Sequence, residues 1–169
     1  MGRALGASVK RLWRLPSVAD TAQLGTALAR TCPWGEGPRL LFLSGELGTG
    51  KTALAAAMLE SLGVTEAVRS PSYALIETYP LTSGVAVHVD CYRLNDAHEL
   101  EQLGLRDHYA SRTLWLVEWP ERARSALPSP DLWLQLRMLG DGRSAEIEAL
   151  SAAGVAWLAA LESTLPRQS

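Results

Sequence analysis

The residues best suited to chemistry lie in one glycine-rich segment, which reads Gly45-Glu46-Leu47-Gly48-Thr49-Gly50-Lys51-Thr52 and is followed by Ala53. Its spacing matches the pattern G-x-x-x-x-G-K-[ST]. In that pattern the glycines allow positive φ angles and a close approach of phosphate oxygens, and the backbone N–H groups form an anion-binding nest. Lys51 would reach the β- and γ-phosphates, and the Thr52 hydroxyl would bind Mg²⁺. The segment therefore predicts a site for a nucleotide with Mg²⁺.

The flanking residues distinguish this segment from a chance glycine-rich turn. The short apolar run Leu40–Leu43 precedes it and indicates a buried strand. Strong helix formers follow it from Thr52 to Leu62 and end before Gly63, a residue typical of a helix C-terminus. A strand, a glycine loop and a helix in this order aim the positive end of the helix at the phosphates.

The lysines indicate which nucleotide binds. GTPases with such a loop recognise guanine through an N-K-x-D motif that follows it. The only lysines of the chain are Lys10 and Lys51, so that motif is absent. We therefore expect ATP.

Two acidic residues are candidates for the other side of the metal. Asp90 and Glu118 each follow an apolar, strand-like segment, and a carboxylate at the end of a strand beside the glycine-loop strand commonly completes a magnesium site. Some of the 18 acidic residues will fall at strand ends by chance, but the apolar run before Glu118 is the stronger signal. From the pattern alone, either carboxylate could join Thr52 at the metal beside the catalytic Lys51, so Asp90 and Glu118 both stay candidates.

The remaining pattern predicts alternating strands and helices. Strands are expected at 11–15, 40–43, 73–79, 85–89, 113–117, 132–139 and 145–150, the last two joined as a hairpin around Gly140-Asp141-Gly142. Helices are expected over 17–30, 52–62, 96–103 and 152–165, with a helical turn or two within 121–127. The sum is an α/β fold of the P-loop NTPase type, a mixed β-sheet flanked by helices.

Length and composition limit the class of protein. The 169 residues, 47% hydrophobic and 20% charged, are typical of one globular domain, expected over 11–169 after a disordered segment 1–10. A net charge of −2 argues against a general nucleic-acid binder. Two distant cysteines, Cys32 and Cys91, argue against a disulfide framework or a zinc site. With no signal peptide and no membrane-spanning run found, we expect a cytoplasmic protein.

Four further segments carry a resemblance to a known family. They are Ser70-Pro71-Ser72-Tyr73, His88-Val89-Asp90-Cys91-Tyr92-Arg93-Leu94, Glu99-Leu100-Glu101-x-x-Gly104 and Val117-Glu118-Trp119-Pro120-Glu121. With the glycine loop, and in this order and spacing, they make the chain from about Leu15 to the C-terminal helix resemble the TsaE (YjeE) family. These are bacterial P-loop ATPases of the tRNA threonylcarbamoyladenosine pathway.

The resemblance implies a function that the residues alone do not show. It implies slow hydrolysis of ATP with Mg²⁺, in a complex with two partner proteins, TsaB and TsaD. TsaD transfers the threonylcarbamoyl group to the tRNA adenosine beside the anticodon, so tRNA is involved only indirectly, and ATP hydrolysis resets the complex between turnovers. By position, the resemblance assigns Lys51 and Thr52 to the phosphate loop, Glu118 to an essential acid at the magnesium, and Asp90 to a second essential acid.

The resemblance also points to segments around the nucleotide. Segments 70–73 and 90–94 match regions likened to switch loops. Nucleotide contacts are implied for the segment 18–21 and for the Gly142-Arg143 turn. Val18 lacks the carboxylate that is often found there, so an adenine contact by this residue is not implied.

A P-loop kinase that phosphorylates a small acceptor is the alternative function. A kinase should carry a lid with paired arginines. No lid insertion is evident, although four arginines keep this alternative open: Arg106, Arg112, Arg122 and Arg124. The three histidines, His88, His98 and His108, lack metal-ligand spacing and are interpreted as structural or surface residues. Trp119, beside Glu118, is the tryptophan expected near the nucleotide.

Overall fold

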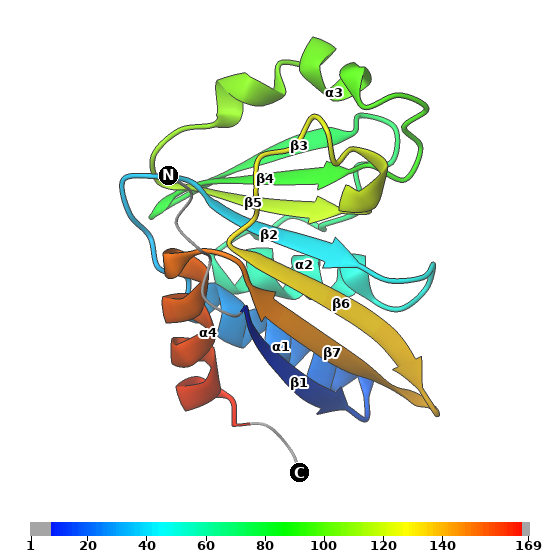
Figure 1. Cartoon of the computed structure of the whole chain (residues 1–169), viewed down its shortest axis with the longest axis vertical. Coiled ribbons are helices and arrows are strands. Elements are labelled where there is room, and N and C mark those ends of the chain that lie inside the picture. The colour runs from blue at the N-terminus through cyan, green and yellow to red at the C-terminus, as the bar shows by residue number, and fades with distance from the viewer. Residues whose placement is uncertain (1–7, 167–169) are drawn as a thin grey trace.

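A computed structural model describes residues 8–166, and its framework is one seven-stranded sheet (Figure 1). The strands are β1 (Val9–Leu15), β2 (Arg39–Ser44), β3 (Ile76–Leu81), β4 (Gly84–Asp90), β5 (Thr113–Glu118), β6 (Leu132–Leu139) and β7 (Gly142–Ala149). Their spatial order is β1-β7-β6-β2-β5-β4-β3. The pairs β2–β5, β2–β6 and β4–β5 are parallel, and the other three pairs are antiparallel. The predicted mixed sheet of an α/β fold is therefore confirmed.

Helices connect and cover these strands. Within residues 8–166 they are α1 (Val18–Arg30), α2 (Lys51–Ser61), α3 (His98–Gln102) and α4 (Ala152–Thr164), with 3₁₀ turns η1 (Leu105–His108) and η2 (Pro120–Arg122). A capping box starts α1, because Ser17 and Asp20 each accept the backbone N–H of the other. None of these helices is both long and apolar enough to span a bilayer.

Apolar side chains cover both faces of the central strands. On one face, Leu41 and Leu43 of β2 belong to a core shared with α1, α2 and α4. On the other face, Phe42 belongs to a second core, which includes residues from α3, η1 and the segment after β5. In Figure 1, α1 and α2 lie behind the sheet and α3 lies beyond β3. Covering on both faces explains why the central strands read as continuous apolar runs in the sequence.

Parallel pairing places the two acidic strand ends side by side. Asp90 pairs in register with Glu118, which also pairs with Leu43 at the end of β2. Because side chains alternate along a strand, both carboxylates lie on the face that α2 covers. The Cys91 N–H donates to the Glu118 carbonyl at 3.0 Å, and the Trp119 N–H donates to the Leu43 carbonyl at 3.1 Å. These bonds hold the ends of β2, β4 and β5 together.

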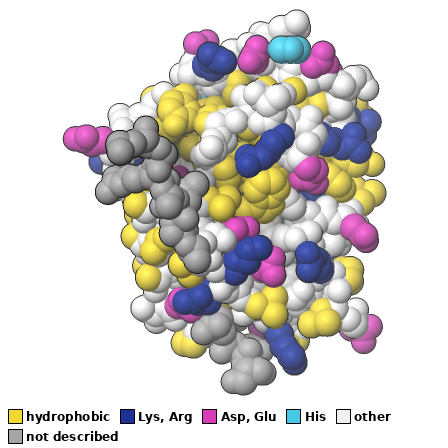
Figure 2. Space-filling model, in the orientation of Figure 1, with side chains coloured by type: hydrophobic (Ala, Val, Ile, Leu, Met, Phe, Trp, Pro, Cys, Tyr) yellow, Lys and Arg dark blue, Asp and Glu magenta, His cyan; other side chains and the backbone are white. Residues whose placement is uncertain are grey.

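The strands β1, β7 and β6 carry α1 and α4 on one face and a polar surface on the other. Lys10 lies 3.3 Å from Glu148 and 3.9 Å from Glu146 across the β1–β7 pair. Figure 2 shows this face, where basic and acidic side chains are interspersed over the lower strands. Ion pairs and partial exposure therefore replace apolar packing on this side of the sheet.

The N-terminal strand begins earlier than the sequence indicated. Val9 and Lys10, placed by sequence in the disordered segment 1–10, pair with Ala149 and Glu148 of β7. Val9 also packs against the core that β2 shares with α1, α2 and α4, called the main core below. The strand therefore starts before its predicted first residue. Residues 1–7 of that predicted segment lie outside the described residues.

The predicted strand 73–79 is wrong at its start. The residues before Ile76 form a turn in which the Leu75 N–H donates to the Pro71 carbonyl at 2.7 Å. Leu75 has a φ of 65°, a left-handed conformation that an apolar pattern cannot reveal. The predicted helix 96–103 shortens to α3. The turns expected within 121–127 form as η2 and as a second turn, in which the Leu127 N–H donates to the Ala123 carbonyl at 3.2 Å.

Replacing Gly25 by alanine is expected to lower the free energy of unfolding by about 1–3 kcal/mol. A Cβ at Gly25 would lie 2.6 Å from the Leu54 carbonyl oxygen and 3.0 Å from the Ala57 methyl, so α1 and α2 would have to separate. This cost exceeds the gain of about 1 kcal/mol that alanine gives within a helix. Chemical denaturation measures the change.

The matched control is Gln23→Ala on the exposed side of α1, which should change stability by less than about 0.5 kcal/mol. A Gly25→Ala protein as stable as the wild type would contradict the close packing of α1 on α2.

Candidate functional site

The glycine loop between β2 and α2 is tightly folded. Gly45 has a φ of 144°, and a Cβ there would come within 2.5 Å of the Leu136 carbonyl oxygen. Gly50, with a φ of 104°, directly precedes α2 in a left-handed conformation that favours glycine. The Thr49 hydroxyl donates to the Glu46 carbonyl at 2.8 Å and closes the loop. The loop thus leads straight into the N-terminus of α2, the end of a helix that attracts anions.

Lys51 is folded into the loop. Its ammonium donates to the carbonyls of Gly45 at 2.7 Å and Glu46 at 2.9 Å, and it lies 4.1 Å from the ring centroid of Trp119. The residue is 4% exposed. Burial lowers the pKa of Lys51, partly offset by the attraction of nearby carboxylates, Glu118 foremost. Because the direct partners of this buried ammonium are neutral, Lys51 would gain from a bound anion.

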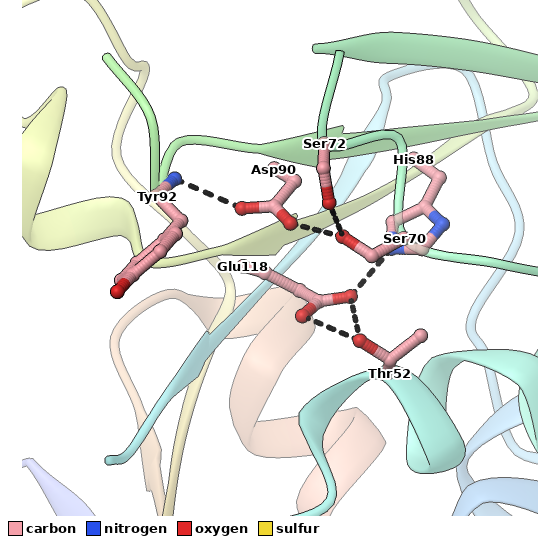
Figure 3. A network of polar contacts seen from close by, with 7 residues as sticks. All are labelled: Thr52, Ser70, Ser72, His88, Asp90, Tyr92 and Glu118. Atoms are coloured by element: carbon pink, nitrogen blue, oxygen red, sulfur yellow. Dashed lines mark hydrogen bonds and ion pairs between the residues drawn. The ribbon is translucent and has the colours of Figure 1, made fainter. Parts of the chain in front are cut away.

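Glu118 is the centre of a buried polar network (Figure 3). The Thr52 hydroxyl lies 3.0 and 2.9 Å from its two carboxylate oxygens, and Nε2 of His88 lies 2.8 Å from Oε1. Glu118 is 2% exposed and His88 is fully buried. A carboxylate in such a place needs hydrogen-bond partners, because burial without them is costly. Nδ1 of His88 has no hydrogen-bond partner within residues 8–166.

Asp90 belongs to a second network, which ties loops together (Figure 3). One carboxylate oxygen accepts the Tyr92 N–H at 2.9 Å, and the other accepts the Ser70 hydroxyl. The Ser72 hydroxyl lies 3.4 Å from that of Ser70. The Asp90 N–H donates to the Leu75 carbonyl at 3.0 Å. Asp90 therefore joins the end of β4 to the turn before β3.

A cavity of about 440 Å³ lies between the glycine loop and these networks. The predicted site residues that line it are Leu47, Gly48, Gly50, Lys51, Thr52, Ala53, Asp90 and Glu118. Five residues join them: Ser70, Ser72, Tyr92, Arg93 and Trp119. The structure thus brings most of the predicted phosphate-loop residues and both predicted acids to one cavity, with Trp119 beside them as expected. Thr49, also predicted, does not line it.

Other predicted contact residues lie around this cavity. Gly45 and Glu46 line a neighbouring cavity of about 680 Å³ on the polar face of the sheet. Arg143 donates through Nε to the Thr49 carbonyl at 2.7 Å, so β7 supports the loop from outside. Gly142 packs against the end of β1. The Gly142-Arg143 turn is thus near the loop but is not part of the cavity lining.

The start of α1 also approaches the loop. Val18 is exposed, whereas Thr21 is buried, and its Cγ2 would lie 3.7 Å from a Cβ at Gly50. The Thr21 hydroxyl has no hydrogen-bond partner within residues 8–166.

The oxygen donors of the cavity suit magnesium. Thr52 and Glu118, which are in contact, offer a hydroxyl and a carboxylate, the ligand types that Mg²⁺ prefers. Residues 8–166 contain no group of three or more His, Cys, Asp and Glu residues placed to hold a metal. Thr52 and Glu118 could serve Mg²⁺ as two protein ligands, with phosphate oxygens and water as the others.

Sequence reasoning missed the place of His88, which it interpreted as a structural or surface residue. His88 is structural in the sense that it is buried, but its ring contacts Glu118 inside the candidate site. The signal was available in the strand period: His88 stands two residues before Asp90 and so shares its face of β4.

The family comparison identifies the family of the chain. The model of the family described as "Threonylcarbamoyl adenosine biosynthesis protein TsaE" matches residues 15–145. The chain belongs to the TsaE family. Its family places it in tRNA threonylcarbamoyladenosine biosynthesis, as the sequence resemblance predicted.

Curated TsaE proteins agree with this assignment. The tRNA threonylcarbamoyladenosine biosynthesis protein TsaE of Haemophilus influenzae is 37% identical over 110 residues, which cover 65% of this chain and 70% of that protein. TsaE of Bacillus subtilis is 33% identical over 131 residues, covering 76% and 78%. TsaE of Streptomyces coelicolor is 41% identical over 123 residues, covering 70% and 80%.

A solved structure shows the same fold. The crystal structure of Bacillus subtilis YdiB superposes with a TM-score of 0.75 and covers 95% of this chain and 99% of its own. The two sequences are 22% identical in this alignment, so the similarity bears on the fold alone.

Replacing His88 by leucine is expected to lower the free energy of unfolding by about 1–3 kcal/mol, because the buried Glu118 carboxylate loses a hydrogen-bond donor. His88→Gln should recover part of this loss, since its amide nitrogen can donate in place of Nε2. Denaturant unfolding measures both variants. His98→Leu is the control, because the side chain of His98 is 76% exposed. Equal stability of His88→Leu and wild type would show that the His88–Glu118 contact contributes nothing.

Proposed function

We propose that this protein is a Mg²⁺-dependent ATPase of tRNA threonylcarbamoyladenosine biosynthesis, which binds ATP, hydrolyses it slowly and acts as a nucleotide switch on the partner proteins TsaB and TsaD. The contact of Thr52 with Glu118, beside buried Lys51, carries the proposal. It puts a metal-binding hydroxyl, a carboxylate and a cation with neutral partners into one cavity. In this proposal tRNA is engaged only through the partners.

Each residue of the cavity has a distinct part in the proposed activity. Lys51 would exchange the loop carbonyls for the β- and γ-phosphate oxygens. Mg²⁺, when bound, supplies charge that neutralises the phosphate oxygens. Thr52 and Glu118 would hold the metal, because the Thr52 hydroxyl already touches both oxygens of that carboxylate. Asp90 would keep the turn before β3 at the phosphate end of the cavity. ATP is assigned over GTP because no lysine follows Lys51 to form an N-K-x-D motif.

Two segments beside the cavity support a switch. The turn 70–75 and the segment 91–97 meet at Asp90, which bonds to both. Both contribute to the cavity lining, and Tyr73 within the turn is 90% exposed. A terminal phosphate can order such segments, and a partner can read their ordered surface. The isolated chain is then expected to be a poor ATPase, because a partner can supply a missing catalytic group in trans.

Lys51→Met should weaken Mg–ATP binding by about 1.5–3 kcal/mol or more, the loss expected for a charge-assisted contact. The fold should persist. The direction of the change in folding stability follows from the pKa of Lys51. Burial lowers the pKa of Lys51 in the folded state, so the charged ammonium costs stability at all pH values below that pKa, and this cost fades as pH rises through it. Removing the lysine should therefore not weaken the fold at neutral pH. Titration calorimetry and denaturation measure the two effects.

The matched control is Lys10→Met, which removes the other lysine, on the polar face of the sheet. Unchanged ATP affinity in Lys51→Met would contradict the proposed site. Equal competition by GTP would contradict the choice of ATP, and phosphorylation of a small acceptor would favour a P-loop kinase.

Glu118→Gln should keep much of the ATP affinity and abolish turnover, because the amide preserves the shape but not the charge that serves the metal. The ATP-loaded variant should then hold the TsaB–TsaD pair as tightly as wild type does with a non-hydrolysable analogue. Phosphate release and partner affinity are measured with the analogue, with ADP and without nucleotide. Identical affinity in all three states would exclude the switch. Loss of turnover in Asp90→Asn but not in Glu118→Gln would reverse the two roles.

A further inference from the structure

A second cationic side chain lines the cavity, and the proposed activity leaves it without a part. Arg93 lies on the connection between β4 and α3 and lines the same cavity as Lys51 and Thr52. The neighbouring Tyr92 N–H is bonded to the Asp90 carboxylate at 2.9 Å. The backbone that carries Arg93 is therefore anchored at the acidic end of β4, beside the predicted metal site.

The guanidinium of Arg93 has an aromatic partner but no acidic one. Its Cζ lies 5.1 Å from the ring centroid of Tyr73. Within residues 8–166 it has neither an ion pair nor a hydrogen bond to a protein acceptor. By contrast, Arg11 pairs with Glu162 at 2.7 Å. The hydrogen-bond donors of Arg93 are therefore left for water or for a ligand in the cavity.

A neighbouring arginine shows that an aromatic contact alone does not bring a guanidinium to this site. Arg122 lies over Tyr92 at 5.1 Å and over Trp119 at 5.9 Å, yet it does not line the cavity. Arg93 both contacts a ring and lines the cavity. Arg93 is therefore the arginine in the lining of this cavity, whereas Arg143 supports the loop from outside.

The charges in the cavity favour a second cation. Lys51 is the one lysine there, while Asp90 and Glu118 bring two carboxylates to the same space. A triphosphate adds more negative charge than Lys51 and one Mg²⁺ can neutralise beside those carboxylates. Arginine suits the remaining phosphate oxygens, because its planar guanidinium can donate two parallel hydrogen bonds to one phosphate group.

We propose that Arg93 is a further ligand of the terminal phosphate of ATP, supplied by the chain itself and oriented by the ring of Tyr73. The proposal rests on the ATP site described above. ADP lacks this phosphate, so the contact would distinguish ATP from ADP. Because Arg93 and Tyr73 belong to different segments, the same contact would couple the terminal phosphate to Tyr73, which is exposed at the surface.

The test compares two affinities on the full chain. Titration calorimetry with Mg²⁺ gives the dissociation constants for a non-hydrolysable ATP analogue and for ADP. Arg93→Ala should weaken binding of the analogue by about tenfold or more. It should weaken ADP binding by less than about fivefold, the effect of removing a surface charge. Arg93→Lys should be intermediate, because it keeps the charge and loses the two-pronged contact.

Two further variants examine the ring. Tyr73→Phe keeps the aromatic face and should match the wild type, whereas Tyr73→Ala should weaken analogue binding by a smaller factor than Arg93→Ala. Arg106→Ala is the matched control, because Arg106 is an exposed arginine that does not line this cavity. Arg93 is itself exposed, so its variants should unfold at the wild-type denaturant concentration.

The outcomes separate this proposal from the proposed function. If Lys51→Met weakens binding of both nucleotides while Arg93→Ala leaves the ratio of the two affinities unchanged, the ATP site stands and the role of Arg93 is refuted. If the wild type binds neither nucleotide, the proposed function fails and the role of Arg93 fails with it. A selective loss of the analogue in Arg93→Ala, absent in Arg106→Ala, supports the proposal.

Discussion

A carboxylate buried at the junction of two strands and a helix cannot be left without partners, and Glu118 is such a group. Its side chain is bonded to Thr52 at the start of α2 and to His88 on β4, while its carbonyl accepts from Cys91. A buried charge without these bonds would cost several kcal/mol, about the margin by which a domain is stable. The position of α2 relative to the sheet, and with it the position of the glycine loop, is therefore tied to one side chain.

The neighbouring backbone also carries strain. Trp119 has a φ of 55°, a conformation that costs a tryptophan about 1–2 kcal/mol. Its N–H is bonded to Leu43, and its ring lies over the Lys51 ammonium. The chain turns at Trp119, directly after Glu118, so β5 ends there. The turn places the Trp119 ring over the glycine loop. Strain and a buried lysine at one place indicate that this region is shaped for a ligand rather than for stability.

The sequence predicted the parts of this site that depend on local spacing. The glycine loop, the strands that end at Asp90 and Glu118, and the hairpin around Gly140 all follow from short patterns that the backbone itself enforces. The contacts of His88 and the approach of Arg93 to Tyr73 depend on sheet register and on the turn at Leu75, whose left-handed φ has no signature in an apolar run. Local pattern therefore predicted most of the residues that meet at the cavity, whereas tertiary pairing decided which of them are in contact.

The two acids of the cavity differ in what holds them, and this difference bears on the proposed switch. Glu118 is bonded to a strand and a helix, elements that pack into the main core. Asp90 is bonded through its side chain to Ser70 and Tyr92, and through its N–H to Leu75, all in connecting segments. Connecting segments open at lower cost than core elements. A displacement of the Glu118 carboxylate is thus resisted by the core. A displacement of Asp90 instead moves the two connecting segments that are bonded to it. A nucleotide switch built on this fold would hold its metal at Glu118 and transmit its state through Asp90.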